Sequence, residues 1–268
     1  MSVVDDLLDE LLDLATDMAA RATDLLVDGL SHHRVEVSTK SSSTDMVTEI
    51  DRASEALIAA GIRAARPDDG IVGEEGADHA GTSGVRWLVD PIDGTTNYLY
   101  AFPGFAVSIG AEYRGEIVVG VVQDPLHREV FRAVKGRGAT CNGAPINAST
   151  KDDLQTALVG TGFSYEPERR RRQAAVLTHV LPHIRDIRRM GAAAVDLCSV
   201  ACGRLDAFYE RGLGPWDLAA GALIAREAGA TVGDLSGGPA SGEFTLAASK
   251  GLFEPLRALL DTAGAGTA

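Results

Sequence analysis

Cysteine is scarce in this chain, and its few copies are not placed to build a disulfide framework or a zinc site. The only cysteines are Cys141, Cys198 and Cys202, an odd number without CxxC spacing, so we expect buried free thiols. The six histidines are scattered, and no two of them have the spacing of metal ligands. Sites made of thiolate or imidazole ligands are therefore not indicated.

Long apolar runs are also absent. No stretch reaches the roughly 18 apolar residues that a membrane-spanning helix needs. The first residues, Met1–Asp6, lack the positive charge that opens a secretory signal. We expect a cytoplasmic protein without a membrane partner.

Positive charge is in short supply. The chain carries 25 Lys and Arg against 38 Asp and Glu, a formal net charge of −13, which argues against a nucleic-acid or anionic-membrane surface. The consecutive arginines Arg169–Arg172 are the exception, and they follow Pro167 and Glu168 at an expected helix start. In so acidic a chain, this run favours a solvated or inter-subunit face over a phosphate or nucleic-acid site.

The pattern of apolar residues predicts an α/β protein. With 268 residues, 45% of them hydrophobic, the chain can bury a substantial core. Neither an internal repeat nor a low-complexity linker divides it, so we expect one domain of two halves, about 1–150 and 151–268. Apolar residues at helical spacing predict helices, and short β-branched runs predict strands. The expected helices cover 3–29, 49–66, 167–180, 192–201, 216–228 and 252–260, and the expected strands 71–73, 87–89, 106–109, 117–122, 130–134, 157–162, 207–209 and 244–247. A coiled-coil role for 3–29 is the weaker alternative to packing on its own domain.

The most informative stretch is Trp87–Tyr98, which reads WLVDPIDGTTNY. It sets Asp90 and Asp93 three residues apart, where an apolar strand is expected to end at Pro91. Gly94–Asn97 predicts a turn into a short helix, whose first N–H groups are unpaired within the helix and favour phosphate. Carboxylates beside an anion site require cations between them, and oxygen ligands select Mg²⁺ or Mn²⁺. The stretch therefore predicts a metal-dependent phosphatase.

Two further segments each offer another carboxylate. Ile71–Gly76 is a short apolar strand that ends in a glycine and an acid pair, Glu74 and Glu75, while Gly214–Ala220 opens a small-residue helix with Asp217 in its first turn. With these segments, the chain resembles the inositol monophosphatase family, whose signatures are an acid pair after a strand, a DPIDGTTN-type loop and a Trp-Asp near the start of a late helix. The resemblance extends over nearly the whole chain, through Lys40–Ser42, Thr44–Asp51, Phe102–Pro103, Ala106–Gly110, Gly191–Ala194 and Asp206–Glu210.

The resemblance implies a fold and an activity. The fold is the α/β/α/β/α sandwich of the inositol monophosphatase and fructose-1,6-bisphosphatase type, with the site between the halves of a single catalytic domain. The activity is Mg²⁺-dependent, lithium-sensitive hydrolysis of myo-inositol monophosphates to inositol and phosphate by a metal-activated water. The family also implies a homodimer and a small phosphorylated polyol as substrate.

The resemblance also implies roles for individual residues. Glu74, Asp90 and the Ile92 carbonyl would hold one Mg²⁺, Asp90, Asp93 and Asp217 would hold the second, and Glu74 would help with a weaker third. Thr95 would pass a proton of the attacking water toward Asp51. The implied substrate contacts are Asp93, Gly94, Thr95, Ala193, Glu210 and Asp217. Lys40 would add positive charge near the metals, and Glu75 would point outward or support the ligands. The N–H groups at Gly191–Ala194 are free to meet a substrate hydroxyl or belong to a plainly packed helix.

Departures from the family pattern leave the substrate open. Ala192 stands where Thr or Ser is frequent, and Gly214 and Pro215 stand where bulkier residues are usual. Relatives in the same superfamily act on histidinol phosphate, fructose 1,6-bisphosphate or 3′-phosphoadenosine nucleotides. Those that act on nucleotides or histidinol phosphate often carry Lys at the second threonine of DGTT, so Thr96–Tyr98 favours inositol monophosphates over bisphosphates and nucleotides. A non-enzymatic alternative is a partner of RNA polymerase or of ribosome assembly, which the intact acid set does not directly support.

Overall fold

A computed structural model describes the backbone of residues 3–31, 37–39 and 46–268, with side chains for 4–30 and 49–268. Its helices are α1 (Val3–Ser31), α2 (Glu49–Ala65), α3 (Thr95–Leu99), α4 (Pro167–Val180), α5 (Ala193–Ala201), α6 (Pro215–Glu227) and α7 (Phe253–Thr262). Short 3₁₀ turns cover Leu154–Thr156, Leu181–His183 and Ala265–Thr267. No helix within these ranges is both long and apolar enough to cross a membrane.

The strands form three sheets. β1 (Val37–Thr39) and β2 (Met46–Thr48) pair with each other. The seven-stranded sheet runs in chain order from β3 to β9: β3 (Gly70–Gly73), β4 (Val85–Asp93), β5 (Ala106–Tyr113), β6 (Glu116–Asp124), β7 (Glu129–Val134), β8 (Ala139–Cys141) and β9 (Ala144–Pro145). The five-stranded sheet has the order β11-β10-β12-β14-β13, with β10 (Leu158–Thr161), β11 (Asp186–Arg188), β12 (Ala207–Glu210), β13 (Thr231–Gly233) and β14 (Thr245–Ala248).

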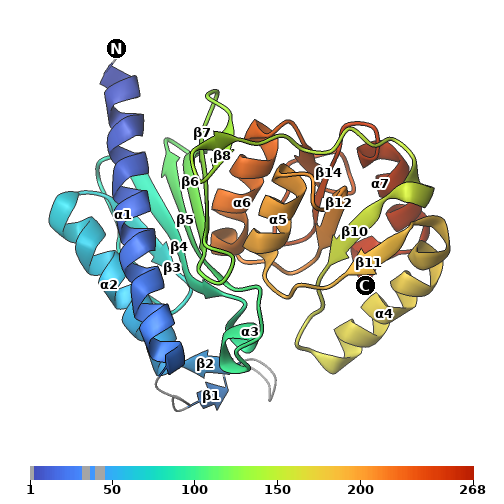
Figure 1. The fold of residues 1–268 in the computed structure, drawn as a ribbon, viewed down its shortest axis with the longest axis horizontal. Coiled ribbons are helices and arrows are strands. Elements are labelled where there is room, and N and C mark those ends of the chain that lie inside the picture. The colour runs from blue at the N-terminus through green and yellow to red at the C-terminus, as the bar shows by residue number, and fades with distance from the viewer. Residues whose placement is uncertain (1–2, 32–36, 40–45) are drawn as a thin grey trace.

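The elements stack in five layers (Figure 1). α1 and α2 cover one face of the seven-stranded sheet, α5 and α6 lie between the two large sheets, and α4 and α7 cover the outer face of the five-stranded sheet. Three apolar clusters fill the spaces between the layers: one beneath α1 and α2, one around α5 and α6 between the two large sheets, and one beneath α4 and α7. They form because every helix and sheet face must bury its apolar side. The α/β/α/β/α sandwich expected from the sequence is confirmed.

The long first helix packs on its own chain. Leu11, Ala15 and Met18 of α1 are buried against α2 and the seven-stranded sheet, and burying a leucine of this kind contributes about 1.5–3 kcal/mol. Gly61 permits the close approach of α2, since a Cβ there would lie 2.1 Å from the Met18 Sδ. The packing of 3–29 on its own domain, preferred over the coiled coil, is the arrangement observed.

The expectation that Pro91 ends its strand is wrong. β4 continues through Pro91 to Asp93, and its pairing with β5 becomes irregular between Asp90 and Asp93. Proline has no N–H to donate to a ladder, so the strand passes it only with a bulge. The short strands β8, β9, β11 and β13 were not expected either, because two- or three-residue strands carry too little alternation to detect.

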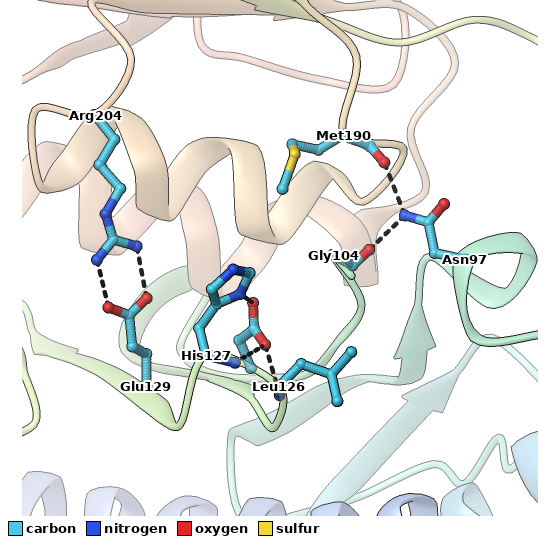
Figure 2. Close-up of polar contacts among 8 residues, drawn as sticks. Asn97, Gly104, Leu126, His127, Glu129, Met190 and Arg204 are labelled. Atoms are coloured by element: carbon cyan, nitrogen blue, oxygen red, sulfur yellow. Dashed lines mark hydrogen bonds and ion pairs between the residues drawn. The ribbon is translucent and has the colours of Figure 1, made fainter. Parts of the chain in front are cut away.

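Two polar contacts join residues from the two halves of the sequence (Figure 2). The Asn97 amide donates to the carbonyls of Gly104, at 2.5 Å, and Met190, at 2.7 Å. Arg204, just after α5, forms an ion pair with Glu129 of β7, and its two terminal guanidinium nitrogens each donate to one carboxylate oxygen. Since Asn97 belongs to α3 and Met190 precedes α5, the first contact lies close to the acidic stretch singled out above.

Candidate active site

Three of the expected acids lie together. One carboxylate oxygen each from Glu74, Asp90 and Asp217 can be chosen so that all lie within 4.8 Å of one another. Asp90 is only 1% exposed, and all three residues line a cavity of about 280 Å³. The cluster has the oxygen-only composition that Mg²⁺ and Mn²⁺ prefer.

Strand pairing explains how Glu74 and Asp90 meet. β3 and β4 are parallel neighbours with Gly73 opposite Val89, so the next residues on both strands lie at the same edge of the sheet. The Glu74 N–H donates to the Val89 carbonyl at 3.2 Å, which continues the ladder by one residue. The two carboxylates are therefore adjacent because of register.

Asp217 arrives on a helix that lies directly on the sheet. α6 packs against β5 and β6, and a Cβ on Gly120 of β6 would lie 2.8 Å from the Ala220 carbonyl oxygen. Glycine is required for that approach. Asp217 accepts a hydrogen bond from the Gly214 N–H at 2.7 Å, which caps the first turn of α6.

Two acids at this site, Asp90 and Asp93, have raised pKa values. Burial raises the pKa of Asp90 well above its ordinary value, and the nearby charges of Glu74, Asp93 and Asp217 raise it further. The pKa of Asp93 is also raised, first by burial and then by Asp217. Like charges held together in a poorly solvated place disfavour ionisation unless a cation lies among them. The donor set therefore fits one or more divalent cations.

Asp93 faces both the cavity and the start of α5. Its two carboxylate oxygens accept hydrogen bonds from the N–H groups of Ala193, at 3.0 Å, and Ala194, at 2.7 Å. The sequence left open whether these N–H groups meet a substrate hydroxyl or belong to a plainly packed helix, and in the structure both donate to Asp93. A carboxylate satisfies helix-terminal donors well because the N-terminus carries partial positive charge.

Thr95 is held between two acceptors. Its hydroxyl lies 3.1 Å from the Ile92 carbonyl and 3.3 Å from a carboxylate oxygen of Asp51. Asp51 belongs to the first turn of α2 and is completely buried. The end of β4, the start of α3 and the first turn of α2 thus bring the Ile92 carbonyl, the Thr95 hydroxyl and a buried acid together. Ile92 and Thr95 line the cavity.

Gly94 has a backbone conformation that favours glycine. Its φ is +90°, and a Cβ would lie 2.8 Å from the Gly104 carbonyl oxygen and 3.0 Å from the Ala192 Cβ. Any side chain would strain this turn and collide with the neighbouring loop. The small residue at Ala192, noted as a departure from the family, is part of this tight packing.

The opposite wall of the cavity comes from the second half of the chain. Glu210, at the end of β12, and Ala193 both line it. Burial, followed by the charge of Asp217, raises the pKa of Glu210 to about 8, although Arg189 and Arg169 act in the opposite direction. Glu210 packs on Gly162, where a Cβ would lie 2.0 Å from its carboxylate.

Arg169 differs from the solvated or inter-subunit face expected for the four consecutive arginines. It lines the cavity, whereas Arg170, Arg171 and Arg172 are exposed as expected for a solvated run. Helical spacing carries a signal that identifies it, because Arg169 lies four residues before the buried Gln173 and on the same face of α4. Arg189, also in the cavity lining, was not singled out by any motif.

Two other residues complete the comparison with the sequence. The side chain of Glu75 is 5% exposed and lies 3.8 Å from Arg52, outside the cavity lining, which agrees with a supporting position. Lys40 lies outside the described residues.

The chain is similar to known proteins over most of its length. The profile of the inositol monophosphatase family matches residues 7–265. The inositol-1-monophosphatase of Mycobacterium bovis is 45% identical over 236 residues, which cover 84% of this chain and 81% of that protein. The Nus factor SuhB of Pasteurella multocida is 41% identical over 230 residues, 85% of this chain and 86% of that protein.

Solved structures agree with this placement. The extragenic suppressor protein suhB from Bartonella henselae has a TM-score of 0.89 at 36% identity, covering 94% of this chain and 98% of that one. The similarity in fold, the profile match and the identity to relatives all extend across both halves. On these grounds the chain belongs to the inositol monophosphatase family and so to the phosphatases.

Proposed function

We propose that this protein is a Mg²⁺-dependent phosphatase of small polyol phosphates, with myo-inositol monophosphate as the first candidate substrate. The observation that carries the proposal is the cluster of Glu74, Asp217 and the buried Asp90 beside the tight Gly94 turn. The inositol-1-monophosphatase of Mycobacterium bovis, at 45% identity, supports the choice of substrate. Because acids from both halves meet in the cluster, we propose that residues 1–268 act as one catalytic unit.

The residues present fit the metals that the family resemblance implies. Glu74, Asp90 and the Ile92 carbonyl would hold one Mg²⁺, and Asp90, Asp93 and Asp217 a second, with Glu74 helping a weaker third. When bound, these cations neutralise phosphoryl oxygens, acidify water and stabilise the leaving alkoxide.

The protein's own groups have separate tasks in this proposal. The Thr95 hydroxyl takes up the proton of the attacking water and passes it toward Asp51, whose carboxylate lies 3.3 Å away. The N–H groups of Gly94 and Thr95 hold phosphate oxygens at the start of α3. Glu210, Ala193 and Asp93 contact the polyol, since all three line the cavity.

A phosphate-release screen tests the proposal. Inositol 1-phosphate, histidinol phosphate, fructose 1,6-bisphosphate and 3′-phosphoadenosine 5′-phosphate are compared with Mg²⁺ and with EDTA. We expect wild type to release phosphate from inositol 1-phosphate only when Mg²⁺ is present. If Asp90→Asn loses this activity and Asp261→Asn keeps it, the activity is located at the acid cluster. Asp261 is a suitable control because it is an exposed acid on α7. Release that is unaffected by EDTA would contradict the proposal.

A second candidate is a binding role in transcription. The observation that favours it is the 41% identity to a protein named Nus factor SuhB. Retention of core RNA polymerase on the immobilised protein tests it. A scaffold would retain the polymerase equally well as wild type and as Asp90→Asn, whereas no retention by either protein excludes the role.

A further inference from the structure

Two arginines lie in the cavity wall that comes from the second half of the chain, and neither has a role in the chemistry described above. Arg169 comes from the first turns of α4, and Arg189 follows β11. Both line the same cavity as the acid cluster, and both act electrostatically on Glu210. The two residues are 20 positions apart in the sequence and converge on Glu210 only in the folded chain.

Glycines make room for both guanidinium groups. A Cβ on Gly212 would lie 2.7–2.9 Å from guanidinium atoms of Arg169, and a Cβ on Gly191 would lie 2.1–3.0 Å from those of Arg189. Gly212 has φ +94° and Gly191 φ +85°, so both positions favour glycine for their backbone as well. The guanidinium group of Arg169 therefore packs against the backbone of Gly212, and that of Arg189 against the backbone of Gly191.

The pair lacks the partners that other arginines of this region have. Arg211, on the same wall, donates to the carbonyls of Glu243, at 3.2 Å, and Ala268, at 2.7 Å. Arg171 and Arg188 form ion pairs with Glu168 and Asp186. Within the described part of the chain, neither Arg169 nor Arg189 has a side-chain hydrogen bond or an ion pair among those found, and the buried Nε of Arg169 has no acceptor.

Arg169 is partly buried whereas Arg189 is exposed, and an unpaired, partly buried guanidinium such as that of Arg169 is costly to maintain. Glu210 interacts electrostatically with both arginines, yet it forms no ion pair with either of them within the described residues. One carboxylate also cannot match two guanidinium groups. Glu166 also lines the cavity but is exposed. The wall is therefore positive on balance, in a cavity whose opposite wall is strongly acidic.

We propose that Arg169 and Arg189 form a subsite for a second acidic group of the substrate, a phosphate or a carboxylate carried by the leaving group. Guanidinium forks bind such groups in a bidentate manner, and a charged acceptor strengthens these hydrogen bonds about twofold over a neutral hydroxyl. The inference rests on the proposed phosphatase chemistry at the acid cluster. It departs from the sequence-based expectation that monophosphates are preferred over bisphosphates.

Three matched esters test the subsite. Sorbitol 6-phosphate, 6-phosphogluconate and sorbitol 1,6-bisphosphate share a linear six-carbon chain and differ at the far end, which is a hydroxymethyl, a carboxylate or a phosphate. We expect kcat/KM to be about tenfold or more higher for at least one acidic ester than for sorbitol 6-phosphate, as suits a charge-assisted contact. The ratio of the two acidic esters identifies which group the subsite accepts.

Variants with matched controls assign the effect to the pair. Arg169→Gln and Arg189→Gln are expected to reduce the acidic-to-neutral ratio toward one, mainly through KM. Arg172→Gln and Arg188→Gln, exposed neighbours outside the cavity lining, should leave the ratio unchanged. A wild-type ratio near one would overturn the proposal, as would variants that slow all three esters equally, because the arginines would then act only through Glu210.

Binding without turnover separates this inference from the proposed function. Thermal melts with each ester report affinity even if nothing is hydrolysed. Greater stabilisation of wild type by the acidic esters, lost in both cavity variants, would uphold the subsite even with no phosphate release. Equal stabilisation by all three esters would overturn it even if the protein is an active phosphatase.

Discussion

The carboxylate of Asp93 accepts a hydrogen bond from the Ala194 N–H at 2.7 Å, so the last residue of β4 caps a helix from the other half of the chain. The neighbouring N–H of Ala193 donates to the second oxygen of Asp93. Asp93 therefore ties β4, the strand that also carries Asp90, to the start of α5. A shift of α5 relative to the seven-stranded sheet would move Asp93, and with it the cavity wall, because both oxygens are tied to the helix.

Replacing Asp90 by Asn should abolish turnover and leave the fold intact. Asp90 is the acid shared by both proposed metals, and an amide cannot provide the same charge. Without metal, the variant should be as stable as wild type or more so, since burial and neighbouring acids raise the pKa of Asp90. Thermal melts with and without Mg²⁺ measure this, and added Mg²⁺ should stabilise wild type far more. Near-normal turnover in the variant would disprove a shared ligand.

Thr95→Ala and Asp51→Asn should each lower kcat by roughly 10² to 10⁴, about 3 to 5 kcal/mol of barrier. Both residues are proposed to handle the proton of the attacking water, and their oxygens lie 3.3 Å apart. Because they act as one relay, the double variant should be hardly slower than either single variant. Metal affinity, measured by titration, should change little. Additive losses would show that the two side chains act independently.

Glu210→Gln should lower kcat/KM for inositol 1-phosphate more than for p-nitrophenyl phosphate. Glu210 lies in the cavity wall contributed by the second half, and only the inositol ester offers hydroxyls for it to bind. Steady-state kinetics on both esters measure the difference. A proportional loss on both would remove the polyol-binding role.

The metal-free protein should lose stability through Glu210 as the pH rises from 4.5 to about 8. The pKa of Glu210 is about 8 in the folded protein against an ordinary 4.5. The folded state therefore favours the protonated group, and this advantage is complete below 4.5 and disappears through the folded pKa. In melts with EDTA, Glu210→Gln should become progressively more stable than wild type across this window. Glu116→Gln, an exposed control, should follow wild type, and parallel curves for Glu210→Gln would show an unshifted pKa.

Lithium should inhibit the enzyme uncompetitively. A monovalent ion that replaces the metal held by Asp90, Asp93 and Asp217 after hydrolysis would carry less charge, so that product phosphate would leave slowly. Inhibition is measured at several substrate concentrations in millimolar LiCl, with NaCl as the control for ionic strength. Full activity in lithium would argue against a second metal at these three acids.

Local sequence alone determined the parts of the site that lie close together in the chain. The DPIDGTTN stretch sets Asp90, Asp93, Gly94 and Thr95 within six residues, and a strand, a bulge and a short helix can place them with little help from elsewhere. The major helices were predicted for the same reason, since their apolar spacing repeats over several turns. The apolar pattern predicted an α/β protein, whereas the layered sandwich was expected from the resemblance to the family.

Only the tertiary structure decided which distant groups meet. It selected Arg169 from a run of four arginines, because the docking of α4 sets which direction faces the cavity. It brought Arg189 to the same wall and directed the N–H groups of Ala193 and Ala194 to Asp93 instead of to solvent. These outcomes depend on contacts between layers, whose geometry results from the packing of many side chains and is written in no single segment.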